Sequence, residues 1–455
     1  MAGKLSGGGL REPVRPLAAG DDLEAPPAPK PEVQLSSVAQ SSVNLVKNIV
    51  GAGVLSLPAG VAAFSSDPRA LVPSLSLTLL FGLASAYGFV LIADACKRTG
   101  ETTYQDTWAK AVGKRTAVFP LLACLAKAII GCVCFQMILG DCLSLLISPL
   151  GLPGFVAGRS GVIMMLTVFI LFPLCTMKSL APLAKFSVLG VLSNVYIAGF
   201  CVLRAVDGSY AAEGALRAAA PIAPKFAEYA GSAWGTTSDP GIAVLLSILS
   251  TAFLAHYNAP LFYEQLAPGA DGKKDKRFLL VSVLGFSGAA LFFSLVMGGG
   301  FATFGKASMG LILNNYAVTD IWASVARGMI AVSLITAYPI VFFSLRKLVI
   351  RILGKTGDMM QRDKPVLFTA LQISVITAIA LTLRDLGKLA ALAGALFGSF
   401  LIYIAPAMMV IGAQMKGLGP KPKGAAGLAN RVLQCALIPC GAALAYLGVM
   451  RTLGA

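Results

Sequence analysis

The chain has 455 residues, of which 56% are hydrophobic and only 13% are charged, and its net charge is +16. Soluble globular proteins carry about 25% charged residues, so this composition excludes an ordinary soluble domain and predicts an all-α polytopic membrane protein. Most of the nine cysteines fall in apolar segments. We expect them to pack as small hydrophobic residues without forming disulfides or zinc sites.

Residues 1–42 are polar and rich in proline and glycine, and they lack the apolar core of a signal peptide. We expect this segment to be a disordered cytosolic tail, and residues 43–455 to form a transmembrane domain. Eleven segments have the roughly 20 mainly apolar residues that a membrane span needs. They cover residues 43–65, 71–95, 118–147, 161–178, 183–206, 242–266, 278–302, 321–349, 366–383, 388–414 and 432–450.

Lysine and arginine residues between the spans indicate the orientation. With the amino terminus in the cytosol, most of them fall on the cytosolic side, as the positive-inside rule requires. The net positive charge therefore flanks a lipid bilayer and needs no nucleic acid to explain it.

A polar segment, 97–117, separates the second and third spans. Tyr104, Trp108 and Val112 recur in it at four-residue steps, which is typical of an amphipathic helix. Two interpretations stay open here, a short helix at the inner membrane surface and a structured loop.

The first span contains Lys47 and the run Gly51-Ala52-Gly53, followed by Pro58. A charge in hydrocarbon is costly and marks a functional site by default, while glycine and proline interrupt a regular helix. Interrupted backbone persists at membrane depth only where it is buried in protein or lines a cavity. This span therefore predicts half of a transport site.

The sixth span supplies a matching interruption. His256, Tyr257, Asn258 and Glu264 surround Pro260 within a strongly apolar segment, and His256 is the only histidine of the chain. Five spans separate the two interruptions in order. This spacing predicts an inverted five-helix repeat in which the first and sixth helices are broken.

Four segments carry a resemblance to a known family. They are NLVKNIVGAGVLSLP at 44–58, AHYNAPLFYEQL at 255–266, GFATFG at 300–305 and TAYPIVFFSLRK at 336–347. They resemble the amino acid/auxin permease family, within the amino acid–polyamine–organocation superfamily, and the resemblance extends over roughly residues 40–450. It implies a fold in which the first and sixth spans unwind and hold the α-amino and α-carboxylate groups of an amino acid.

The resemblance implies substrate contacts at both interruptions. The expected substrate-binding residues are Gly51, Ala52, Gly53, Val54, His256, Tyr257 and Asn258. The alternatives are close helix packing for the glycines and hydrogen bonds to freed backbone groups for the sixth-span residues.

Lys47 and His256 are the candidate coupling residues. Sodium-coupled members of the family carry Asn at the position of Lys47 and Thr shortly before the span-eight proline, where this chain has Ala337 and Tyr338. Proton-coupled members carry Lys at the first position, and an imidazole titrates near neutral pH. We therefore expect protons or no coupling ion. The alternatives are that Lys47 reaches the cytosolic surface and that His256 is a packing residue.

Three further polar residues lie within spans. Lys127 and Arg327 are cations for which we expect an ion pair with Asp94, Asp141 or Glu264, and Asn194 is a candidate polar contributor to the core.

The sequence carries no phosphate-binding loop, nucleophile elbow or cluster of metal ligands. We therefore expect no enzyme activity, no cofactor and no metal. The predicted function is secondary-active transport of neutral amino acids by alternating access, in the plasma membrane or a vacuolar or lysosomal membrane. The alternative is an amino acid sensor that signals without net transport.

Overall fold

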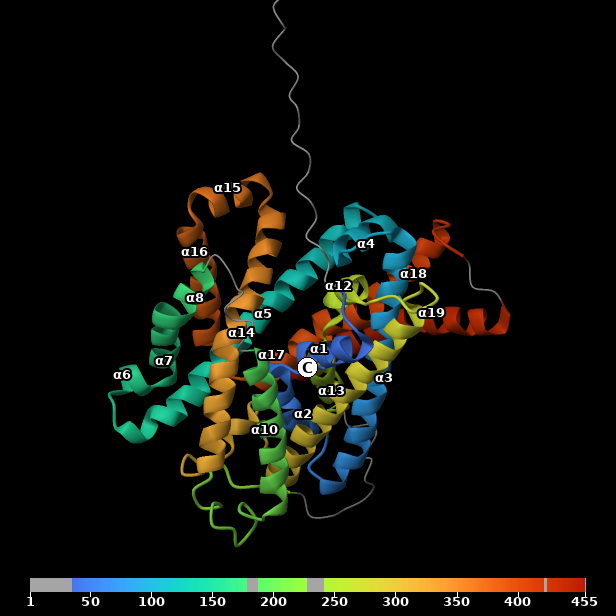
Figure 1. Cartoon of the computed structure of the whole chain (residues 1–455). Helices are drawn as coiled ribbons and strands as arrows, with labels where there is room; N and C mark the ends of the chain where they lie inside the picture. Colours follow the sequence, from blue (N-terminus) through green and yellow to red (C-terminus); the bar gives the residue numbers. More distant parts are fainter. Residues whose placement is uncertain (1–34, 178–186, 227–240, 421–423, 455) are drawn as a thin grey trace, which may run out of the picture. The chain divides into compact units, whose positions relative to one another are not determined.

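The computed structural model describes residues 35–177, 187–226, 241–420 and 424–454, and its helices lie in the unit that begins at Leu35 (Figure 1). Residues 1–34, which hold most of the predicted tail, lie outside the described residues.

Within the described ranges, ten helical segments are long and apolar enough to cross a membrane. They are α3 (Leu71–Thr99), α5 (Val118–Ile147), α7 with α8 (Arg159–Leu166 and Phe172–Thr176), α10 (Ser187–Val206), α11 with α12 (Ile242–Ala252 and Ala259–Gln265), α13 (Asp275–Phe304), α14 (Ile321–Leu353), α16 (Pro365–Thr382), α17 with α18 (Leu386–Ala393 and Ala405–Met415) and α19 (Gly424–Leu453). The bent pair α1 (Val38–Ile49) and α2 (Leu57–Phe64) supplies an eleventh span. The predicted number and order of spans are confirmed.

The first helix starts earlier than expected. α1 begins at Val38, ahead of the predicted span start at residue 43, because Ser37 caps it by accepting a hydrogen bond from the Gln40 N–H at 3.2 Å. The Ser42 hydroxyl donates to the Val38 carbonyl at 2.8 Å. The apolar pattern used to predict the spans does not detect a first helical turn made of polar residues.

Segment 97–117 contains a short helix, α4 (Tyr104–Ala111), with Thr103 as its N-cap. Tyr104 and Trp108 are both 2% exposed. The Tyr104 hydroxyl donates to the Leu401 carbonyl at 3.2 Å, and the Trp108 ring packs against Phe400. The predicted short helix is confirmed, and Tyr104 and Trp108 pack against the protein, while its position at the inner membrane surface stays a prediction.

The long helices reverse the pattern of a soluble protein. On α3, Leu79, Leu80 and Leu83 are more than half exposed, whereas Ser74 and Thr78 are completely buried. Each buried hydroxyl donates to the carbonyl four residues earlier, so neither leaves a polar group unsatisfied. Exposed leucines are favourable where the surrounding solvent is lipid.

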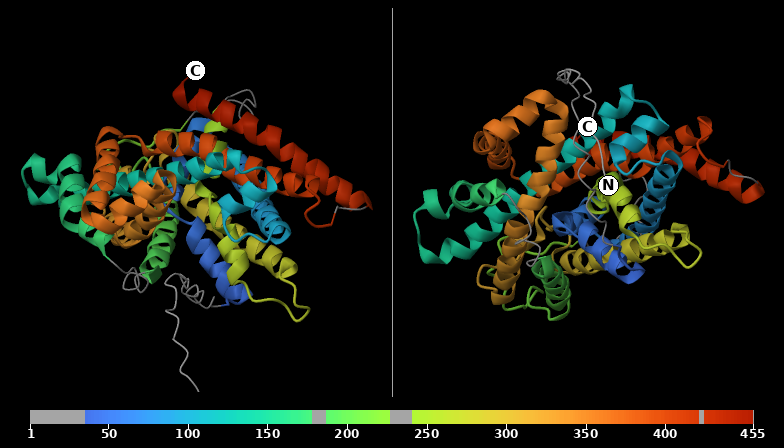
Figure 2. Two further views of the ribbon diagram at one scale, coloured as in Figure 1. Left: turned by 90° about the horizontal axis from the view of Figure 1, so that it is seen from above. Right: turned by 45° about the horizontal axis from the view of Figure 1, so that its top comes forward.

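Long helices distant in sequence pack side by side. α3 contacts α13, and α5 contacts α14 (Figure 1, Figure 2). Phe89 of α3 stacks on Phe278 of α13 with ring centroids 5.4 Å apart. These contacts surround the interruptions of α1–α2 and α11–α12.

A buried ion pair joins α10 to the start of α14. Arg204 donates to Asp320 through Nη2 at 2.6 Å and Nε at 2.9 Å, and the Asp320 side chain is 0% exposed. Asp320 also caps α14 by accepting the Trp322 N–H. The Tyr210 hydroxyl donates to Asp320 at 3.0 Å, and burial raises the pKa of Tyr210, so the phenol remains a donor.

Asp320→Ala is expected to lower the free energy of unfolding by about 3–5 kcal/mol, because it leaves the Arg204 cation without its buried counter-charge. The control is Asp207→Ala. Asp207 also pairs with Arg204, but its side chain is 26% exposed, so the expected loss is about 1 kcal/mol or less. Chemical denaturation in detergent micelles compares the two variants. Equal losses of unfolding free energy in the two variants would contradict the prediction that Asp320 is the main counter-charge of Arg204.

Candidate functional site

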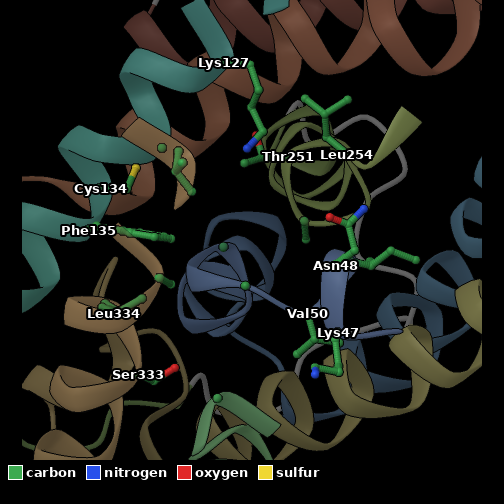
Figure 3. Close-up of a pocket in the computed structure, with 18 of the residues that line it drawn as sticks. Lys47, Asn48, Val50, Lys127, Cys134, Phe135, Thr251, Leu254, Ser333 and Leu334 are labelled. Atoms are coloured by element: carbon green, nitrogen blue, oxygen red, sulfur yellow. The ribbon is translucent and has the colours of Figure 1, made fainter. Parts of the chain in front are cut away.

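A cavity of about 540 Å³ lies where the first and sixth spans are interrupted (Figure 3). The interruptions contribute Gly51, Gly53, Thr251, Ala252 and Tyr257 to its wall, and α5, α10, α14 and α17 complete it. Cavities of about 300–1,000 Å³ hold small ligands. The space therefore suits a small molecule that contacts exposed backbone.

The first interruption turns the chain sharply. α1 ends at Ile49, Gly51 adopts an extended conformation, and a 3-10 turn over Ala52–Ser56 leads into α2. The two helical pieces are bent by 51°. Pro58 stands in the first turn of α2, where its missing N–H costs nothing. The first N–H groups of such a turn have no intrahelical partner and carry partial positive charge.

The second interruption has the same plan. α11 ends at Ala252, a 3-10 turn covers His256–Asn258, and Pro260 stands in the first turn of α12. At the end of α11, the Leu249 and Thr251 carbonyls accept the N–H groups of Phe253 and Leu254 at 2.9 and 3.3 Å, and the other carbonyls of the last turn lack intrahelical partners. They carry partial negative charge that suits an ammonium group.

Side chains secure the two interruptions. Asn258 Nδ2 donates to Asn48 Oδ1 at 3.0 Å and links the spans directly. Asn194 Nδ2 of α10 donates to the Val50 carbonyl at 3.2 Å, which confirms Asn194 as a polar contributor to the core. The Thr251 hydroxyl donates to the Ala390 carbonyl of α17.

The structure brings four of the predicted site residues to the cavity: Lys47, Gly51, Gly53 and Tyr257. Val54, which is 4% exposed, is not among the lining residues, nor are His256 and Asn258. Ala52 contributes its backbone to the 3-10 turn.

The glycines leave different amounts of room. A methyl group on Gly51 would meet no atom within 4 Å, so this position opens into the cavity. A methyl group on Gly53 would lie 3.5 Å from the Ala252 Cα. Gly53 therefore lets the two interrupted spans approach each other closely.

His256 lies behind the cavity. It is 0% exposed, its Nε2 lies 2.8 Å from the Ser85 carbonyl of α3, and its ring meets Phe89 edge to face. Among the described residues, Nδ1 has no hydrogen-bond partner. Since Nε2 must carry the proton to donate to the carbonyl, Nδ1 is a buried lone pair with no partner for a second proton.

Two lysines face the cavity, Lys47 from α1 and Lys127 from α5, and no Asp or Glu is among the described residues that line it. Lys127 Nζ lies 6.0 Å from the centroid of the Tyr257 ring. The predicted ion pairs of Lys127 and Arg327 with Asp94 or Asp141 are wrong, because both aspartates pair with other arginines. Asp141 binds Arg159 at 2.6 Å and Asp94 binds Arg98 at 2.8 Å.

Arg327 is paired without an acid. It is completely buried and donates to the backbone carbonyls of Leu313 and Tyr316 at 2.9 and 2.7 Å. Loop carbonyls replace the expected carboxylate because the chain folds back over α14 at this point.

Most of the cavity-lining residues on α5 and α14 were not predicted from the sequence. α5 contributes Ile130, Gly131, Cys134 and Phe135, and α14 contributes Ile330, Ser333, Leu334, Thr336, Ala337, Ile340 and Val341. The α5 residues recur at three- and four-residue steps from Lys127, which places them on one helical face. That spacing was the available signal.

A second cavity of about 540 Å³ lies on the other side of α17. Its polar lining includes Asp141, Asn314, Arg384 and Lys388. Leu386 lines both cavities. The start of α17 is therefore a thin barrier between two spaces.

Known proteins match almost the whole chain. The family model described as transmembrane amino acid transporter protein matches residues 34–453. Solute carrier family 38 member 8 of Mus musculus is 27% identical over 426 residues, which are 90% of this chain and 92% of that protein. Vacuolar amino acid transporter 2 of Saccharomyces cerevisiae is 25% identical over 384 residues, 82% of this chain and 75% of that protein. A Danio rerio protein whose name includes "sodium-coupled neutral amino acid transporter 11" is 26% identical over 374 residues, 82% and 78% of the two chains.

Solved structures share the fold. The inward-facing conformation of Mhp1 aligns with a TM-score of 0.59 at 13% identity and covers 92% of this chain and 91% of that chain. MhsT in complex with L-phenylalanine aligns with a TM-score of 0.51 at 13% identity and covers 92% and 99% of the two chains. These alignments confirm the predicted fold class.

Proposed function

Because this chain belongs to the transmembrane amino acid transporter family, it is a membrane transporter and not an enzyme, and we propose that it carries neutral amino acids by secondary-active alternating access. The coupling ion is a proton, or transport is uncoupled. The amino terminus is cytosolic, and the membrane is the plasma membrane or that of a vacuole or lysosome.

The cavity between the two interrupted spans supports this proposal most directly. The start of the turn at Ala52 offers N–H groups to a carboxylate, and the end of α11 offers carbonyl groups to an ammonium. An amino acid carries both groups on one carbon. The absence of Asp and Glu among the described lining residues favours side chains without a positive charge.

The two cavities support alternating access. Each lies on one side of α17, and Leu386 borders both. A shift of α17 relative to α2 and α11, which it contacts, would join the substrate cavity to the second cavity. The first cavity includes Asn44 and Phe262, which lie toward the loops rich in Lys and Arg, so we assign this conformation as open to the cytosol.

Lys47 supports coupling without sodium. Lys47 is a half-buried residue of the cavity wall, to which Asn194 and Ser333 also contribute. A second cation beside it would be repelled. Some relatives have sodium-coupled in their names, and in this chain the lysine takes the place that the family resemblance gives to an Asn.

Substitutions at Gly51 test the substrate site. Gly51→Leu is expected to abolish uptake of radiolabelled L-alanine into proteoliposomes, because the side chain would enter the open space beside Gly51. Gly51→Ala is the matched control and should keep most activity, since a methyl group meets no atom there. Normal uptake by the leucine variant, at equal protein content, would remove this cavity from consideration.

Replacing external sodium with choline is expected to leave L-alanine uptake unchanged, because the Lys47 ammonium already supplies a positive charge at the cavity. The measurement is initial uptake into proteoliposomes over a range of sodium concentrations. A saturable sodium requirement would contradict the proposal.

Lys47→Met is expected to abolish concentrative uptake driven by an inward proton gradient, while counterflow exchange, which needs no driving ion, persists. We propose Lys47 as the coupling residue because it lines the cavity, whereas His256 is enclosed behind it. His256→Gln should therefore keep the parental pH profile. The reverse result, a flat profile for His256→Gln and normal coupling for Lys47→Met, would assign coupling to the histidine.

A further inference from the structure

One face of α5 forms a continuous wall of the substrate cavity. Lys127, Ile130, Gly131, Cys134 and Phe135 all line the cavity and share this face. Figure 3 shows the Lys127 side chain pointing toward the end of α11, where Thr251 and Leu254 lie. Lys127 is therefore the charged member of an otherwise apolar and small-residue surface.

The Lys127 side chain leans into the cavity. A methyl group on Gly131, one turn further along α5, would lie 4.0 Å from Lys127 Nζ. Helical side chains ordinarily point back toward the amino-terminal end, and a lysine near a membrane surface extends toward water. With the amino terminus in the cytosol, α5 starts on the cytosolic side, so this lysine extends away from the nearer surface. An ammonium held toward the membrane centre is costly unless it has a function.

Among the described residues, no acidic side chain forms an ion pair with Lys127. Lys127 Nζ lies 6.0 Å from the centroid of the Tyr257 ring, and no acidic residue is among the described residues of the wall. Asp94 and Asp141 are engaged by Arg98 and Arg159. The field of this ammonium therefore acts on whatever occupies the cavity.

The position of Lys127 relative to the backbone-binding groups determines what it would meet. An amino acid held by the turn at Ala52 and the end of α11 has its side chain directed at the remaining wall, which includes the α5 face. Ile130, Cys134 and Phe135 suit an apolar side chain. A cationic side chain of the length of lysine or arginine would bring its charge close to Lys127.

We propose that Lys127 is a charge-selecting residue of the substrate cavity, which admits amino acids with uncharged side chains and excludes those with cationic side chains. This inference rests on the proposed function and adds the residue that limits the substrate class. Two unit charges about 7 Å apart in a partly solvated protein site repel each other enough to weaken binding by about 10- to 100-fold.

The test compares lysine with norleucine, which has the same carbon chain without the terminal ammonium. Both compete with counterflow of radiolabelled L-alanine in proteoliposomes that hold the full chain. For the parent, the half-inhibitory concentration of lysine should exceed that of norleucine by about 10- to 100-fold. In Lys127→Met, the ratio should fall at least about tenfold, while inhibition by norleucine stays close to the parental value.

Two variants separate charge from structure. Lys127→Arg keeps the positive charge and should retain the parental ratio. Lys347→Met is the matched control, because Lys347 is an exposed lysine of α14 whose Nζ lies 4.6 Å from the Phe343 ring, outside the cavity lining. It should leave the ratio unchanged. If Lys127→Met does not transport, competition of the two amino acids for binding to the purified variant gives the same ratio.

An unchanged ratio in Lys127→Met, or a parent that accepts lysine as well as norleucine, would overturn the charge-selection proposal and leave the proposed function intact. A parent that neither exchanges alanine nor binds norleucine would overturn both.

Discussion

Backbone groups freed inside a membrane must find partners within the protein, because hydrocarbon offers none. This constraint shapes the centre of the molecule. Where α1 ends, Asn194 donates to the Val50 carbonyl, and where α11 ends, the Leu254 N–H donates to the Thr251 carbonyl. The amide pair of Asn258 and Asn48 then fixes the two interruptions to each other. Gly51, Gly53, Thr251 and Ala252 line the cavity, so the places where the helices break also border the space that can hold a ligand.

The sequence predicts the features that depend on local composition. Apolar length determines the spans, and Gly51, Gly53 and Pro260 determine where two of them break, because backbone freedom and a missing N–H act on the residue itself. The start of α1 at Val38 needed only one further local signal, the Ser37 cap. Lys47 was identified as a cavity residue because a charge within an apolar segment is conspicuous in any context.

Side-chain direction at an interruption depends on tertiary packing, and the sequence does not predict it. His256 belongs to the same turn as Tyr257, yet Tyr257 lines the cavity while His256 packs between Phe89 and Phe286. No helical or strand period relates neighbours in such a turn, so proximity in sequence gave no guide to which one faces the ligand. The partners of Arg327 were missed for a similar reason, since they are loop carbonyls that carry no residue signature.

Polar contacts also show which spans are held together by buried hydrogen bonds. Gln136 of α5 donates to the Tyr338 hydroxyl of α14 at 3.0 Å and to the Thr377 hydroxyl of α16 at 3.1 Å, all within buried surroundings. Separating these spans would leave polar groups unsatisfied in an apolar interior, at a cost of about 1–3 kcal/mol for each group. Contacts between α3 and α13 around Phe89 are dispersive and aromatic, and an exposed ion pair of Lys97 with Asp275 joins the ends of the same two helices. Buried hydrogen bonds therefore hold α5, α14 and α16 together, and Lys127 belongs to this set while Lys47 belongs to the interrupted first span.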